Sequence, residues 1–132
     1  SYLMAMPGIP CIYYGDEIAD VGGNDPDNRR VMRFDDLSLE EGNTLSWTSE
    51  WIKLRRSRMS LIYGSCNIEA LSHTLLKITR EYLGEESVVY INKSKESVEI
   101  SADGKSIIAG EAEKIQSGLI TIPSQSAICL GN

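Results

Sequence analysis

The sequence predicts an α+β chain in two parts, an α/β segment over residues 1–63 and a small antiparallel β-sandwich over residues 64–132. Residues 9–14 form a short apolar run without alternation, which is typical of a strand buried on both faces of a parallel sheet. Residues 48–63 carry apolar side chains over one half of a helical wheel. After Gly64 the pattern changes to short alternating runs separated by turn residues, which favours antiparallel strands.

The N-terminal residues resemble the end of a helix. Residues 2–6 are apolar and have no Ser-x-x-Glu capping signal before them, so we expect the chain to start inside a larger structure. Pro7 and Gly8 separate this turn from the predicted strand. Residues 21–36 are dense in turn formers and lack apolar periodicity, which predicts a long loop directly after the strand.

Two helix starts follow the loop. Ser38 and Glu41 have the spacing of a capping box, but Gly42 is expected to end that helix quickly. Thr48 or Ser49 can cap a longer helix that runs to Tyr63 and stops at Gly64.

Two arginines interrupt the apolar half of this longer helix. A guanidinium at such a position needs a carboxylate or several carbonyl oxygens as partners. We therefore predict that Arg55 is a partly buried structural residue. The alternative is that both arginines extend to the rim of the apolar face, and for Arg58 we favour this alternative.

The second part contains short β-branched or alternating runs separated by turn signals. Their spacing predicts strands over residues 74–82, 87–92, 97–101, 118–122 and 127–130. His73 precedes the first of these strands and is expected at the surface rather than as a catalytic base.

Charge and hydropathy exclude two classes of partner. The 132 residues include 13 Lys and Arg against 19 Asp and Glu, a formal net charge of −6, which gives no general attraction to nucleic acid. The longest apolar run, residues 2–14, is too short to span a bilayer and is broken by prolines. We expect neither a nucleic-acid nor a membrane partner.

The cysteines predict no cofactor site. Cys11, Cys66 and Cys129 are widely separated and His73 is the one histidine, so no zinc-ligand spacing occurs and we expect no metal or other cofactor. An odd number of separated cysteines slightly favours reduced thiols in a cytoplasmic protein, although one bridge plus one free thiol remains open.

Candidate chemistry is concentrated in residues 15–30. Asp25 and Arg29 are four positions apart, and a turn at Pro26 could bring them together, offering acceptor and donors to the vicinal hydroxyls of a sugar. The alternative is a solvated loop whose Asp and Asn residues merely favour turns. Asp16 and Glu17 are adjacent, so their side chains point to opposite faces of an extended segment, and they are poor candidates for a facing catalytic pair.

Two ordered motifs resemble the α-amylase family of glycoside hydrolases, in particular its neopullulanase and cyclomaltodextrinase-like members. The first motif spans residues 7–17, Pro-Gly-Ile-Pro-Cys-Ile-Tyr-Tyr-Gly-Asp-Glu, and the second spans residues 22–30, Gly-Gly-Asn-Asp-Pro-Asp-Asn-Arg-Arg. A helix with Leu54-Arg55 before Leu61-Ile62-Tyr63-Gly64 and a β-rich tail also fit. The resemblance covers essentially the whole chain, most weakly in its last third.

This resemblance implies a fold and a site. Residues 8–17 would be the last strand of a (β/α)8 barrel, residues 21–47 its long loop and residues 48–63 its last helix, followed by an antiparallel C-terminal domain. Asp25 and Arg29 would contact glucose on the non-reducing side of the cleaved bond, with Asp16 and Glu17 structural. The family's catalytic carboxylates and its Asn-His-Asp sequence would lie upstream of Ser1.

The first functional hypothesis is therefore a C-terminal piece of a retaining glycosidase that acts on α-glucans such as starch and maltooligosaccharides. The isolated chain would be inactive, and its partners would be the α-glucan, the N-terminal part of the same chain and, through exposed residues 9–14, a second copy. The alternative is a non-catalytic carbohydrate-binding or interaction module. In the β part, Tyr82 and Tyr90 would be the aromatic platform, but core burial is as consistent with their alternating runs.

Overall fold

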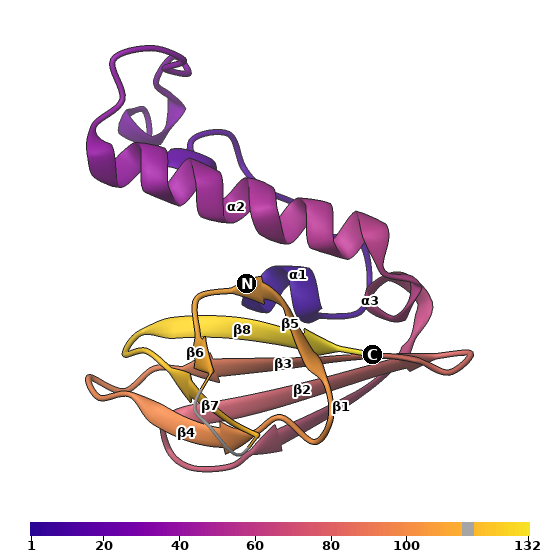
Figure 1. Ribbon diagram of the computed structural model, residues 1–132. Helices are drawn as coiled ribbons and strands as arrows, with labels where there is room; N and C mark the ends of the chain where they lie inside the picture. The colour runs from indigo at the N-terminus through magenta and orange to yellow at the C-terminus, as the bar shows by residue number, and fades with distance from the viewer. Residues whose placement is uncertain (115–117) are drawn as a thin grey trace.

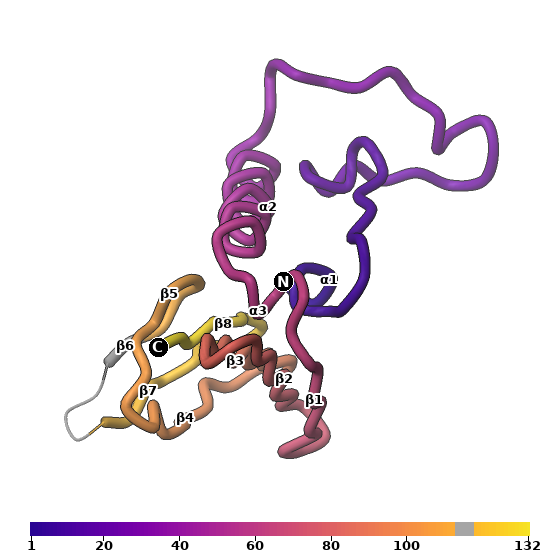
Figure 2. Tube along the Cα trace, turned by 90° about the vertical axis from the view of Figure 1, so that its right-hand side faces the viewer, coloured from indigo at the N-terminus to yellow at the C-terminus, as the bar shows by residue number. Residues whose placement is uncertain are grey.

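A computed structural model describes residues 1–114 and 118–132. Three helices lie over one face of a five-stranded antiparallel sheet, and a three-stranded sheet covers the other face (Figure 1). The loop before the longest helix extends away from both sheets, as Figures 1 and 2 show from two directions. Among the described residues, no helix combines the length and apolarity needed to cross a membrane.

The N-terminal segment contains little regular structure. Helix α1 spans Tyr2–Ala5, and the short 3-10 helices η1 and η2 span Asp16–Ile18 and Asp27–Arg29. The strand predicted over residues 9–14 is absent, and the side chain of Ile9 is 97% exposed. A strand needs a hydrogen-bonding neighbour, and none of the described strands pairs with this segment.

Helix α2 spans Leu39–Ser57 and replaces the two predicted helices. Its capping box is confirmed, because Ser38 Oγ accepts from the Glu41 amide while the Glu41 carboxylate accepts from the Ser38 amide. The prediction that Gly42 ends this helix is wrong. A glycine in a helix costs only about 1 kcal/mol relative to alanine, a penalty that a capping box offsets.

The helix predicted to run to Tyr63 is interrupted near its C-terminal end. Arg58 has extended backbone angles (φ −120°, ψ 114°) and separates α2 from helix α3, which spans Met59–Tyr63. Gly64 terminates α3 as expected, although its φ is −66°. A side chain at this position would collide with the carbonyl oxygens of Ser60 and Glu81, so the close approach of α3 to the sheet requires glycine.

The antiparallel sandwich is confirmed. The five-stranded sheet has the order β1-β2-β3-β8-β5 and the three-stranded sheet the order β4-β7-β6. The strands are β1 Ser65–Ala70, β2 Leu75–Tyr82, β3 Glu85–Asn92, β4 Val98–Ser101, β5 Ser106–Gly110, β6 Glu113–Lys114, β7 Leu119–Ile122 and β8 Ser126–Gly131. All five predicted strands form, whereas β1, β5 and β6 were not predicted.

Two hydrophobic cores lie on the two faces of the larger sheet. Val89 of β3 and Cys129 of β8 face the helices, while their neighbours Tyr90 and Ile128 face the smaller sheet. The helix-side core also contains residues of α1, α2 and α3, namely Met4, Ala5, Trp51, Leu54 and Leu61. Residues 1–63 therefore pack onto the β part through this helix-side core. All three cysteines are free thiols.

Arg55 is buried where α2 crosses α1. Its guanidinium donates hydrogen bonds to the carbonyl oxygens of Met4 (2.6 Å), Met6 (2.8 Å) and Gly8 (2.6 Å). These include carbonyls that a helix end leaves without an intrahelical partner. Burial lowers the pKa of Arg55, and the positive charge of Arg80 lowers it further.

Arg80 of β2 complements this arrangement from the sheet. It is fully buried and donates to the carbonyl oxygens of Ala5 (2.7 Å), Gly64 (2.9 Å) and Ser65 (2.9 Å). The role of Arg80 was not predicted. Arg80 lies two residues after Ile78, so both side chains point to the same inward face of β2. This spacing is the signal in the sequence that could have identified Arg80 as buried.

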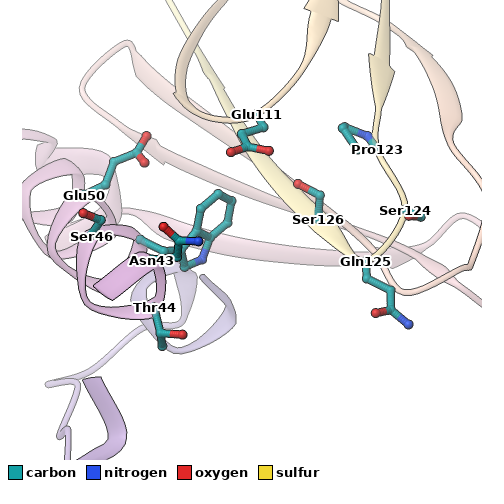
Figure 3. A pocket seen from close by; sticks show the side chains of 10 residues that line it. Asn43, Thr44, Ser46, Glu50, Glu111, Pro123, Ser124, Gln125 and Ser126 are labelled. Carbon is teal, nitrogen blue, oxygen red and sulfur yellow. The ribbon is translucent and has the colours of Figure 1, made fainter. Parts of the chain in front are cut away.

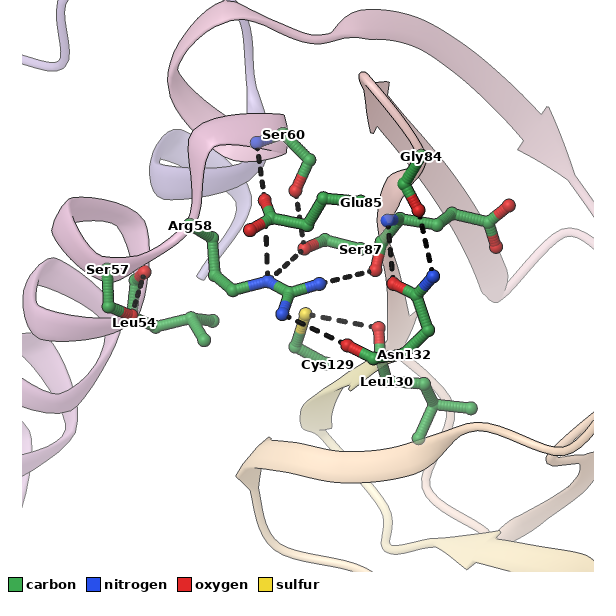
Figure 4. Close-up of polar contacts among 11 residues, drawn as sticks. Leu54, Ser57, Arg58, Ser60, Gly84, Glu85, Ser87, Cys129, Leu130 and Asn132 are labelled. Carbon is green, nitrogen blue, oxygen red and sulfur yellow. Dashed lines mark hydrogen bonds and ion pairs between the residues drawn. The ribbon is translucent and has the colours of Figure 1, made fainter.

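Arg58 connects the break between α2 and α3 to the edge of the sandwich (Figure 4). It donates to Ser87 Oγ (3.1 Å) and to the main-chain oxygens of Glu86 (2.7 Å) and Asn132 (3.2 Å). The Glu85 carboxylate lies 3.6 Å from Arg58 and accepts from the Ser60 amide at 2.6 Å. Arg58 thus does not extend to the rim as predicted, because the ends of β3 and β8 supply polar partners.

We predict that Arg55→Met lowers the free energy of unfolding by about 3 kcal/mol, because buried carbonyl oxygens lose their charged donors. The neighbouring Arg56 is exposed, so Arg56→Met is a matched control that should change stability by less than about 0.5 kcal/mol. Urea denaturation of both variants measures the difference. Equal effects of the two substitutions would contradict a structural role for Arg55.

We also predict that Glu85 makes the free energy of unfolding depend on pH in the acidic range. Burial raises the pKa of Glu85, but hydrogen bonds from Ser60 and the charge of Arg58 outweigh burial, and the pKa lies below its ordinary value of 4.5. The stabilisation is present above the unfolded-state pKa and is lost as pH falls through the folded-state pKa. Glu85→Gln should therefore lose less stability than the wild type between about pH 5 and pH 3.

The control for this experiment is Glu99→Gln, since Glu99 is exposed on β4. Its acid profile in urea denaturation should parallel that of the wild type. A parallel profile for Glu85→Gln as well would show that Glu85 does not contribute to the acid dependence.

Candidate functional site

The candidate site is the loop that connects the N-terminal segment to α2. Its first turn is held against α2 by η1, where Ile18 is buried. Its second end is joined to α2 by an ion pair between Arg33 and Glu41. Hydrogen bonding from Arg33, and then from Ser38, lowers the pKa of Glu41, so the carboxylate that caps α2 also fixes the end of the loop.

Asp16 and Glu17 shape the turn at the start of the loop. Asp16 Oδ2 accepts a hydrogen bond from the Tyr13 amide at 3.2 Å, and Glu17 Oε2 accepts from the Gly15 amide at 2.8 Å. Both carboxylates are therefore engaged with nearby backbone.

Asp25 and Arg29 come together across η2. Arg29 Nη2 donates to Asp25 Oδ2 at 2.7 Å, and the side chains are 68% and 58% exposed, respectively. The pair leaves the other carboxylate oxygen and most guanidinium N–H groups open to solvent. The arrangement can present acceptors and donors side by side to a polar ligand.

A second ion pair supports the same turn. Arg30 pairs with Asp27, whose Oδ2 also accepts from the Gly23 amide at 2.9 Å. The hydrogen bond from Gly23, followed by that from Arg30, lowers the pKa of Asp27. Asp27 and Arg30 thus fold residues 23–30 into a compact turn from local contacts.

A hollow of about 230 Å³ lies between this turn and the start of the loop. It is lined by Tyr13, Tyr14, Gly15, Asp16, Asp20, Val21, Gly22, Asp27, Asn28 and Arg30. Asp25 and Arg29 are not among its lining residues. Sequence analysis did not single out Tyr14, Asn28 or Arg30 individually, although all three belong to the two motifs that carry the family resemblance.

The other described residues offer neither a cluster of metal ligands nor a buried histidine. Within residues 1–114 and 118–132, no three or more His, Cys, Asp or Glu side chains gather as a metal ion would require. His73 is exposed.

Comparisons with known proteins define what this arrangement resembles. No protein-family model matches the chain. It is 34% identical over 128 residues to a cyclomaltodextrinase of Thermoanaerobacter pseudethanolicus, an alignment that covers 93% of this chain and 22% of that relative.

Solved structures show the same similarity to enzymes of this kind. An Anoxybacillus α-amylase matches with a TM-score of 0.79 and 29% identity, over 98% of this chain and 30% of that structure. A Nostoc punctiforme debranching enzyme matches with a TM-score of 0.78 and 28% identity, over 98% of this chain and 29% of that structure. The chain thus spans less than a third of each of these proteins. In sequence and in fold, the chain matches the C-terminal portion of α-amylase family enzymes.

Proposed function

We propose that the chain is the C-terminal part of a retaining glycosidase that acts on α-glucans with α-1,4 and, in some substrates, α-1,6 linkages. In this proposal Asp25 and Arg29 hold a glucose unit next to the cleaved bond. The observation that carries the proposal is the exposed ion pair of these two residues at 2.7 Å, on the loop that carries the family resemblance.

The chemistry of the pair suits a sugar. A carboxylate accepts hydrogen bonds from hydroxyl groups, and a guanidinium donates to hydroxyl oxygens in a fixed geometry. Because Asp25 and Arg29 already contact each other, little side-chain entropy is lost when a pair of vicinal hydroxyls binds to both. The adjacent pair of Asp27 and Arg30 keeps the turn in place.

Cleavage in this proposal proceeds by double displacement. One carboxylate attacks the anomeric carbon while a carboxylic acid protonates the leaving oxygen, and water then hydrolyses the glycosyl-enzyme. Both groups would come from a part of the enzyme outside these 132 residues. The role of this chain is to bind and orient the sugar, so that binding energy is used at the reacting bond.

The division of the chain is part of the same proposal. Residues 1–63 would belong to the catalytic domain and residues 64–132 would form the C-terminal β domain. An apolar hollow of about 460 Å³, lined by Ile9, Pro10, Ile12 and Ile52, supports a further contact there, since Ile9 is 97% exposed. Its partner would be the preceding part of the same chain or, failing that, a second copy.

The alternative is a non-catalytic carbohydrate-binding or interaction module carried by the β part. Tyr90 is buried at 6% exposure, and Tyr82 packs on Tyr63 with ring centroids 5.9 Å apart. The buried Tyr90 therefore offers no aromatic platform, and Tyr82 is half-buried beside Tyr63. We favour the loop of Asp25 and Arg29 as the sugar-binding element.

We predict that Arg29→Ala weakens binding of maltotriose to the chain about 10- to 100-fold, the loss expected for charge-assisted hydrogen bonds. The control is Lys53→Ala, which removes an exposed cation from α2 and should leave the dissociation constant unchanged. Chemical-shift titration of the loop resonances measures both constants. Equal binding by Arg29→Ala and wild type would refute the binding role.

We further predict that the isolated chain releases no reducing sugar from maltoheptaose or starch above the rate without protein. A reducing-end assay at high protein concentration tests this, and an active α-amylase serves as the positive control. Turnover that follows the folded chain through purification would contradict the proposal that the catalytic carboxylates lie elsewhere.

A further inference from the structure

A third hollow lies between α2 and the turn that joins β7 to β8. Its volume is about 620 Å³, and Figure 3 shows residues of α2 on one side and of the β part on the other. We call it the α2–β8 groove and define it by Asn43, Trp47, Glu50, Glu111, Gln125 and Ser126. Its volume is within the range of small-molecule sites.

An aromatic side chain forms one wall of the α2–β8 groove. Trp47 is half-buried, and its ring centroid lies 5.8 Å from that of Trp51 at an interplanar angle of 47°. Trp51 is buried in the helix-side core, so it holds Trp47 in place. The groove therefore has a supported aromatic wall rather than a mobile surface side chain.

Polar side chains occupy the rest of the groove. Glu50 Oε1 accepts from the Gly110 amide at 2.9 Å, which ties α2 to the end of β5. Gln125 is positioned by its backbone amide, which donates to the Ser94 carbonyl at 3.1 Å. Within the described part of the chain, the side chains of Asn43 and Glu111 make no hydrogen bond to other groups and both are exposed. They are available to a ligand.

We propose that the α2–β8 groove binds a saccharide, and specifically a linear α-glucan. An aromatic wall beside amide and carboxylate groups matches a pyranose, which has an apolar C–H face and a rim of hydroxyls. Among the residues whose side chains the structure describes, no lysine or arginine lines the groove, which disfavours anionic ligands such as phosphates. The choice of an α-glucan rests on the proposed function, whereas the site itself does not include Asp25 or Arg29.

The test is a two-dimensional NMR titration of the 132-residue chain with maltoheptaose. The chain has two tryptophans, and a Trp47→Phe variant assigns their indole N–H resonances. Saturable movement of the Trp47 indole resonance is expected. The double variant Asn43→Ala/Glu111→Ala should bind about tenfold more weakly at the groove, the effect of losing exposed hydrogen-bonding partners.

Three controls distinguish α-glucan binding at the α2–β8 groove from a general effect of removing a glutamate, from binding at the loop and from binding of other ligand classes. Glu99→Ala removes an exposed glutamate outside the groove and should bind as the wild type does. Arg29→Ala should leave movement of the Trp47 resonance unchanged, so failure of the loop site and failure of the groove are distinguishable. Cellohexaose and trilysine, a β-linked glucan and a cationic peptide, should not move it.

Several results would overturn the proposal. These are an unmoved Trp47 resonance at the solubility limit of maltoheptaose, movement confined to the loop, and undiminished binding by the double variant. Equal movement with cellohexaose would overturn the α-glucan assignment, and movement with trilysine alone would assign the groove to a cationic ligand instead.

Discussion

Two buried arginines, whose described partners are carbonyl oxygens and include no carboxylate, hold the helices to the sheet. Arg55 from α2 and Arg80 from β2 reach the same short stretch of backbone, the end of α1 and the residues after it. Their hydrogen bonds go to carbonyl oxygens alone, so each guanidinium is desolvated and compensated only by peptide dipoles. That arrangement tolerates no shift of α1, because a displaced carbonyl would leave a buried charge without its acceptor.

The constraint determines where the candidate loop begins. Arg55 fixes the Gly8 carbonyl, and the chain continues from that residue to η1 and the turn of Asp25 and Arg29. Beyond η1 the turn is organised by contacts close in sequence, such as Asp27 with Arg30. The site is thus positioned by packed structure at its start and by the Arg33–Glu41 ion pair at its end. Its own shape depends on exposed ion pairs, which individually contribute little to stability.

Sequence predicts the parts of this fold that depend on local patterns. The capping box at Ser38, the alternating strands and the partners that Arg55 requires all follow from spacing. The run over residues 9–14 has the composition of a buried strand, but a strand forms only against a neighbour. Continuation of α2 through Gly42 depends on how far the capping box outweighs the cost of a glycine, which the residue types alone do not decide. The burial of Arg80 depends on tertiary contacts that local patterns do not report. At the candidate site, the pairing of Asp25 with Arg29 follows from spacing, whereas the α2–β8 groove joins residues far apart in the chain.

Helix α2 connects all of these features. Its first turn meets the loop through Glu41, its middle meets β5 through Glu50, and its last turn meets α1 through Arg55. Arg58 then ends the helix by binding the edge of the sandwich. At 1.5 Å per residue the helix is about 28 Å long, so it transmits the position of the sheet to the loop as a single rigid element. The β part therefore contributes to the loop through the orientation of α2, since the loop itself extends away from both sheets.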